Sequence, residues 1–150
     1  MDLKELYRDV ILDHNKRPRN FGVLAPPATS ARGHNPLCGD QLTIYAKVEN
    51  GISKELKFEG SGCAISVASA SLMTEALTGK TLGQADTLYT QIHALLTHAD
   101  TPDSTSTVDL GKLAALSGVR EFPARVKCAS LCWHTLQAAL NDPTTPVCTE

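Results

Sequence analysis

The sequence predicts an α+β fold in which a small antiparallel β-sheet is covered on one face by helices. Three observations predict it: apolar residues at helical spacing near the N-terminus, a stretch of alternating residues around a turn signal at 41–59, and further helical patterns after residue 63. The chain has 150 residues, of which 42% are hydrophobic and 20% charged. This size and composition suit one globular domain and disfavour a disordered chain, a collagen-like repeat or a long coiled coil.

The first predicted element is an amphipathic helix that ends near Lys16. Asp2 and Glu5 have the spacing of a capping box, and apolar residues then recur every three or four positions. Pro18 restricts the backbone of the residue before it, so the helix should stop there. Prolines, glycines and asparagines punctuate the stretch that follows, and we expect residues 17–36 to form an irregular surface loop.

A β-hairpin is predicted over residues 41–59. Apolar and polar residues alternate over residues 42–48, as in a half-buried strand, and the alternation resumes on the return strand. Asn50-Gly51 lies between the two stretches. This pair favours a two-residue hairpin turn because both central residues of that turn need a positive φ.

The remaining segments are predicted to be mainly helical. We expect helices at residues 64–78, 86–98, 110–119 and 123–140, a polar loop at residues 101–109, and a disordered tail from about residue 143. Neither an internal repeat nor a domain boundary is evident, so residues 1–150 are expected to form a single domain.

Charge and hydropathy bear on localisation and partners. The chain carries 14 basic and 16 acidic residues, a formal net charge of -2, and no basic cluster of the kind that binds nucleic acid or anionic membrane. No stretch reaches the roughly 18 apolar residues of a membrane span, and the N-terminus lacks the apolar core of a signal peptide. We therefore expect a cytoplasmic protein without nucleic-acid or membrane partners.

The five cysteines, at positions 38, 63, 128, 132 and 148, are the main candidates for chemistry. An odd number at wide spacing in a chain without an export signal argues against disulfides. Because the hairpin returns the chain, Cys38 and Asp40 before its first strand should lie near Cys63 after its second. Cys128 falls on the first turns of the last predicted helix, and Arg125 lies on the same helical face.

Three thiolates and one carboxylate make a four-coordinate set for zinc or for an iron–sulfur cluster. A carboxylate oxygen is easier to displace than a thiolate, as a site that hands on its contents requires. Arg125 and Lys127 can offset the negative charge of such a set. Spacing alone leaves the metal site and a purely structural role for these residues about equally supported, since no close Cys-x-x-Cys pair is present.

Other residues have less specific interpretations. Cys132 is expected to be a buried structural residue, and Cys148 an exposed thiol without a role. The histidines at positions 14, 34, 93, 98 and 134 are expected at the surface or partly buried rather than as ligands. His34 is the exception, since it precedes Cys38 closely and is a candidate substitute ligand or base. A hydrolase or oxidoreductase built on Cys38 and His34 is disfavoured because no third member of a triad is evident.

Four ordered motifs resemble the IscU/SufU, or NifU-like N-terminal, family. They are the N-terminal residues 6–20, Asn35-Pro36-Leu37-Cys38-Gly39-Asp40, Gly60-Ser61-Gly62-Cys63-Ala64-Ile65-Ser66, and the run from Phe122 through Cys128 to Trp133. The resemblance extends over about residues 3–140. The long stretch between Cys63 and Cys128, and Lys127 in place of a histidine, resemble the SufU branch of the family.

The resemblance implies a protein of iron–sulfur cluster assembly that binds zinc through Cys38, Asp40, Cys63 and Cys128. It implies that Cys38 accepts persulfide sulfur from a SufS-type cysteine desulfurase, with downstream Suf cluster-assembly proteins as further partners. Arg125 resembles a basic residue that supports such a site electrostatically. The alternative implied by IscU-type relatives is a scaffold on which a 2Fe–2S cluster is assembled and transferred, with iron in place of zinc.

Overall fold

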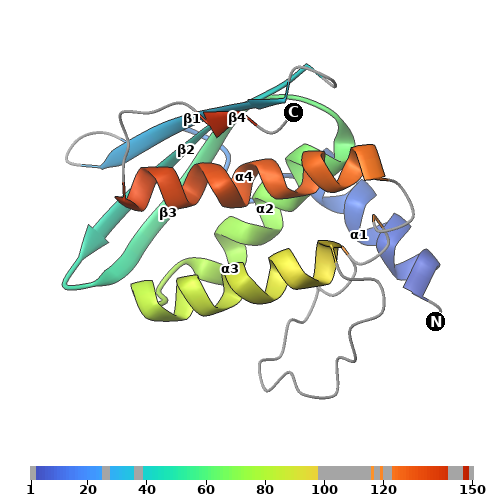
Figure 1. Cartoon of the computed structure of the whole chain (residues 1–150). Helices are drawn as coiled ribbons and strands as arrows, with labels where there is room; N and C mark the ends of the chain where they lie inside the picture. The colour runs from blue at the N-terminus through green and yellow to red at the C-terminus, as the bar shows by residue number, and fades with distance from the viewer. Residues whose placement is uncertain are drawn as a thin grey trace.

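The computed structural model describes residues 3–24, 28–35, 39–97, 116, 119, 123–141 and 147–148. Within this part of the chain, a four-stranded sheet of order β3-β2-β1-β4 is covered on one face by helices (Figure 1). The elements in chain order are α1 (Leu3–Lys16), β1 (Thr29–Asn35), β2 (Asp40–Glu49), β3 (Ile52–Ser61), α2 (Ala64–Leu77), α3 (Leu82–Thr97), α4 (Pro123–Asn141) and β4 (Val147–Cys148). The α+β architecture is as predicted.

The predicted hairpin is confirmed. β2 and β3 are antiparallel, and the turn residues Asn50 and Gly51 have φ values of 54° and 74°. These are the positive values that a two-residue turn between twisted strands requires. The register pairs Gln41 with Ser61, so the beginning of β2 and the end of β3 lie at the same end of the sheet.

The expected loop over residues 17–36 is wrong in its last part, because Thr29–Asn35 forms β1 and pairs antiparallel with β2. The inward positions of β1 are Ala31, Gly33 and Asn35, so the strand lacks the large apolar residues that reveal a strand in sequence. α4 fills the space above them. A Cβ atom added at Gly33 would lie 2.0 Å from the Oγ1 atom of Thr135, so β1 must be small here.

Two further expectations need correction at element ends. α3 begins at Leu82 rather than at residue 86, because Thr81 and Gln84 cap it reciprocally: the Gln84 N–H donates to Thr81 Oγ1 and the Thr81 N–H to Gln84 Oε1. Val147–Cys148, expected in a disordered tail, forms the short strand β4, which pairs parallel with Gly33 and His34 at the open edge of β1. The other tail residues after 141, the polar loop 101–109 and most of the predicted helix 110–119 lie outside the described residues.

The helices form two layers over the sheet. α4 lies against β1 and β2, and α2 lies against β3 and α4, while α1 contacts α2 and α3 contacts α4. Buried residues on α2 include several serines and alanines, whose small side chains allow α4 to approach closely. The Ser69 hydroxyl, for example, donates to the backbone carbonyl of Ala129 and accepts from Trp133 Nε1. None of the described helices is long and apolar enough to cross a membrane.

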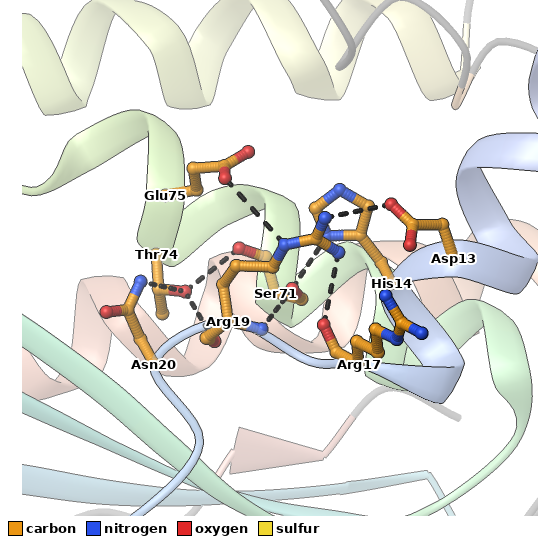
Figure 2. A network of polar contacts seen from close by, with 8 residues as sticks. All are labelled: Asp13, His14, Arg17, Arg19, Asn20, Ser71, Thr74 and Glu75. Atoms are coloured by element: carbon orange, nitrogen blue, oxygen red, sulfur yellow. Dashed lines mark hydrogen bonds and ion pairs between the residues drawn. The ribbon is translucent and has the colours of Figure 1, made fainter.

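A polar network attaches the end of α1 to α2 (Figure 2). His14 is fully buried, contrary to the expectation that it is at most partly buried, and its Nδ1 atom lies 2.7 Å from Ser71 Oγ. His14 is buried because it continues the inward stripe of α1 formed by Val10 and Ile11. The same hydroxyl accepts the backbone N–H of Arg19 at 2.8 Å. The chain after α1 is thereby held against α2.

Candidate metal centre

Asp40, Cys63 and Cys128 lie together at the end of the sheet where β2 begins and β3 ends. Their carboxylate oxygen and two sulfur atoms all lie within 4.8 Å of one another. The residues come from the start of β2, the connection that leads into α2, and the first part of α4. The expectation that the hairpin brings Asp40 near Cys63 is confirmed, and Cys128 on α4 lies at the same place.

Asp40 is completely buried and is oriented by the loop that carries Cys63. The backbone N–H of Cys63 donates to Asp40 Oδ1 at 2.8 Å, and the Cys63 thiol lies 3.7 Å from Oδ2. Gly62 provides the space for this carboxylate, since a Cβ atom at Gly62 would lie 2.6 Å from Oδ1. One carboxylate oxygen is therefore anchored by backbone while the other faces sulfur.

Cys63 caps the N-terminus of α2. Its sulfur accepts the backbone N–H of Ser66 at 3.4 Å, and its backbone is extended, with φ −69° and ψ 164°. The positive end of a helix dipole favours negative charge at this position, which a metal-bound thiolate carries. Cys63 is partly buried, so one side of the site faces solvent.

Cys128 is fully buried on α4. Its sulfur lies 3.7 Å from the carbonyl oxygen of Ala124 and accepts a hydrogen bond from the side-chain amide of Asn35 at 3.8 Å. The sequence did not identify Asn35 as a site residue, although it belongs to the motif that contains Cys38. A buried polar side chain at the end of a strand is the signal that identifies it, but this signal appears only once β1 is known.

Two thiols and a carboxylate at this separation fit a metal centre. Three anions this close would repel one another, and burial would deprive each of them of hydration. A cation among them would offset both costs. Thiolate-rich sets of this kind suit zinc and iron–sulfur clusters. The donor set therefore fits both zinc and an iron–sulfur cluster, and these residues would supply three of the four ligands of a tetrahedral site.

None of the other candidate residues that the structure describes belongs to this cluster. Cys38 lies outside the described residues. Arg125 is exposed in the first turns of α4. His34 is not part of the cluster: it is exposed and lies on the opposite face of β1 from Asn35, because side chains alternate along a strand. There it lines a cavity of about 640 Å³ on the outer face of the sheet, together with Arg32, Gln41 and Glu59.

Cys132 has the structural character expected of it. It is fully buried one helical turn after Cys128, and its thiol lies 3.4 Å from Ser69 Oγ. Burial raises the pKa of Cys132 to about 12, an effect that the hydrogen bond with Ser69 only partly opposes. The thiol therefore stays neutral and unreactive at neutral pH.

Comparisons with known proteins identify relatives over most of the chain. Residues 6–129 match the family model described as the NifU-like N-terminal domain. The chain is 43% identical over 136 residues to the zinc-dependent sulfurtransferase SufU of Bacillus subtilis, an alignment that covers 91% of this chain and 90% of that protein. It is 38% identical over 149 residues to the iron–sulfur cluster assembly scaffold protein IscU of Thermotoga maritima, covering 97% and 100% of the two chains.

Solved structures share the same architecture. A protein from Fervidobacterium islandicum, described as a scaffold for iron–sulfur cluster assembly in the SUF system, superposes with a TM-score of 0.74 at 30% identity, covering 91% of this chain and 98% of that one. The N-terminal part of a NifU-like protein from Brucella abortus, at 23% identity and a TM-score of 0.80, covers 92% of this chain and 94% of that one and shares the fold.

Proposed function

Because the chain belongs to the NifU-like N-terminal domain family, we propose that it acts in iron–sulfur cluster assembly as a zinc-dependent acceptor and carrier of sulfur, supplied by a cysteine desulfurase. The observation that carries the proposal is the convergence of Asp40, Cys63 and Cys128 to within 4.8 Å. The 43% identity to a zinc-dependent sulfurtransferase over most of both chains supports zinc over other metals.

The proposed zinc ligands are Asp40, Cys63, Cys128 and, as the fourth, Cys38. Zinc prefers four-coordinate sites with thiolate and carboxylate donors, and it keeps its thiol ligands deprotonated at neutral pH. Three thiolates and one carboxylate leave a formal charge of about −2 on a zinc site. Arg125, exposed at the start of α4, is proposed to offset part of this charge.

Cys38 is the proposed sulfur acceptor. Its thiolate attacks the outer sulfur of the desulfurase cysteine persulfide, the sulfur–sulfur bond breaks, and the desulfurase cysteine leaves as a thiolate. Cys38 then carries the persulfide, and no external oxidant or reductant is consumed. Cys38 suits this role better than Cys128. Pro36 lies two residues before Cys38 and Gly39 follows it directly, as in a loop, whereas Cys128 is held by a helix.

The proposal extends to partners and compartment. The desulfurase is proposed to be of the SufS type, with Suf cluster-assembly proteins as later recipients of the sulfur. Sulfur transfer needs reduced thiols, so a reducing compartment such as the cytoplasm is the proposed location.

A second function has an observation in its favour. The relative from Thermotoga maritima that aligns over 97% of this chain is named as a cluster assembly scaffold, and the same ligands suit a 2Fe–2S cluster. Anaerobic reconstitution with iron and sulfide separates the two functions. A scaffold yields a stable, transferable visible chromophore, whereas a zinc-dependent sulfur carrier does not.

Mass spectrometry tests the sulfur-carrier function directly. The purified chain is incubated with a cysteine desulfurase and cysteine in the absence of reductant, and the zinc content is measured on the same preparation. We expect about one zinc per chain and a gain of one sulfur atom at Cys38. The Cys38→Ser variant should lose this addition while still forming a complex with the desulfurase. A persulfide found on other cysteines while Cys38 stays unmodified contradicts the assignment.

A further inference from the structure

Asn35 has an unusual position relative to the metal centre. It is the last residue of β1, only 1% exposed, and its register partner on β2 is the candidate ligand Asp40. Its side chain lies on the inner face of the sheet, where α4 packs, because Ala31 and Gly33 occupy the alternate inward positions before it. A polar side chain at this depth needs hydrogen-bond partners.

The contacts of Asn35 reach different parts of the site. Its side-chain amide donates to Cys128 Sγ at 3.8 Å, across 93 residues of sequence. Its backbone carbonyl accepts the N–H of Gly39 at 2.8 Å. Cys38 lies between these two residues in sequence, and Gly39 has the positive φ of 72° that glycine adopts without strain. Asn35 thus contacts the candidate ligand Cys128 through its side chain and Gly39 through its backbone.

We infer that Asn35 is a positioning residue of the proposed metal site: its side-chain amide holds the Cys128 sulfur in place as a ligand. The inference rests on the proposed function and adds to it a residue that is not itself a ligand. Residues that orient metal ligands contribute about 10- to 100-fold to metal affinity or activity in other sites.

The chemistry of the amide suits this role. A hydrogen bond to an anionic acceptor is stronger than one between neutral groups, so the N–H contributes most when Cys128 is a thiolate. An amide also adds this donor without adding charge and without titrating. Loss of the N–H removes one hydrogen-bond donor from the buried Cys128 thiolate. The lone pairs of this sulfur are then less stabilised.

Two substitutions isolate the contribution of the Asn35 side chain, because the hydrogen bond from the Gly39 N–H to the carbonyl of residue 35 is made by the backbone and is kept in both variants. Asn35→Ala removes the amide, and Asn35→Asp keeps its shape but replaces the donor with a carboxylate. Thr135→Val is the matched control. Thr135 is buried on α4 against Gly33 of β1, so the change disturbs the same helix–strand contact about two turns from Cys128.

The test uses the full chain loaded with zinc and, separately, with cobalt(II). For both Asn35 variants we expect transfer of zinc to a chromophoric chelator to be about tenfold faster than in the wild type. The thiolate-to-cobalt charge-transfer band should move to longer wavelength in both. Thr135→Val should lower thermal stability while leaving the zinc transfer rate and the band position unchanged.

The outcomes separate the inference from the proposed function. If both Asn35 variants release zinc at the wild-type rate and keep the wild-type band, Asn35 is not a positioning residue. A wild-type chain that binds cobalt but accepts no sulfur overturns the proposed function, while the band shift still decides the role of Asn35. A wild-type chain that binds neither metal overturns both.

Discussion

The backbone N–H of Cys63 donates a hydrogen bond of 2.8 Å to Oδ1 of Asp40, so the loop that supplies one candidate ligand orients another. The bond joins the start of β2 to the start of α2 and leaves Oδ2 facing the Cys63 sulfur at 3.7 Å. The carboxylate is thus preorganised to offer one oxygen to a cation, because its other oxygen is already engaged.

Substitution of Gly62 should disturb this carboxylate. In Gly62→Ala the new methyl group would lie 2.6 Å from Asp40 Oδ1, and the site must shift. We expect a loss of about 1–3 kcal/mol in unfolding free energy, together with a lower zinc content, measured by thermal denaturation and metal analysis. Gly83→Ala on α3 is the control, since among the described residues its methyl group meets only Thr81 Oγ1, at an ordinary contact distance of 3.9 Å. Equal stability and equal zinc content of the two variants would contradict the role of Gly62 in providing space for the Asp40 carboxylate.

Asp40→Cys should bind zinc more tightly and accept sulfur more slowly. The change closes the proposed site with four thiolates and removes the oxygen ligand, which is the easiest one to displace. Competition with a chelator measures the first effect, and the rate of persulfide formation measures the second. If this variant accepts sulfur as fast as the wild type, the carboxylate does not serve ligand exchange.

Cys128→Ala and Cys132→Ala should differ although both cysteines are fully buried on α4. Cys128→Ala is expected to lose zinc and thermal stability together, because a proposed ligand is removed. Cys132→Ala is expected to cost on the order of 1 kcal/mol, through the lost packing of a small buried side chain, while zinc binding is retained. Cys148→Ala should change neither property. Full zinc content in Cys128→Ala would remove Cys128 from the ligand set.

Ser71→Ala should destabilise the protein without affecting the metal. The Ser71 hydroxyl contacts His14 Nδ1 at 2.7 Å and accepts the Arg19 N–H at 2.8 Å (Figure 2). Removing it takes a partner from two groups at once, which should cost about 1–3 kcal/mol. Thr87→Ala, at an exposed hydroxyl on α3, serves as the control and should have little effect. A Ser71→Ala protein as stable as wild type would mean that this network does not hold α1 in place.

The parts of the site that were predicted correctly depend on local signals. Asn50-Gly51 specifies a tight turn by itself, and a tight turn between two alternating stretches places Asp40 and Cys63 at one end of a sheet whatever surrounds them. Cys128 is different. Its helix was predicted, but spacing left its role undecided, because the packing of α4 over β1 and β2 involves residues far away in the sequence.

The sequence by itself determined that α1, α2, α3 and α4 are helices, where the hairpin turns, and which donor atoms the candidate site offers, since periodicity, turn residues and donor atoms are properties of short segments. Only the tertiary structure decided that Thr29–Asn35 is a strand and that Asn35 contacts Cys128. At these positions the packing of α4 on β1 decides which residues fit. α4 leaves room only for a glycine at position 33 and places the Cys128 sulfur beside the amide of Asn35, and the local sequence pattern of β1 indicates neither contact.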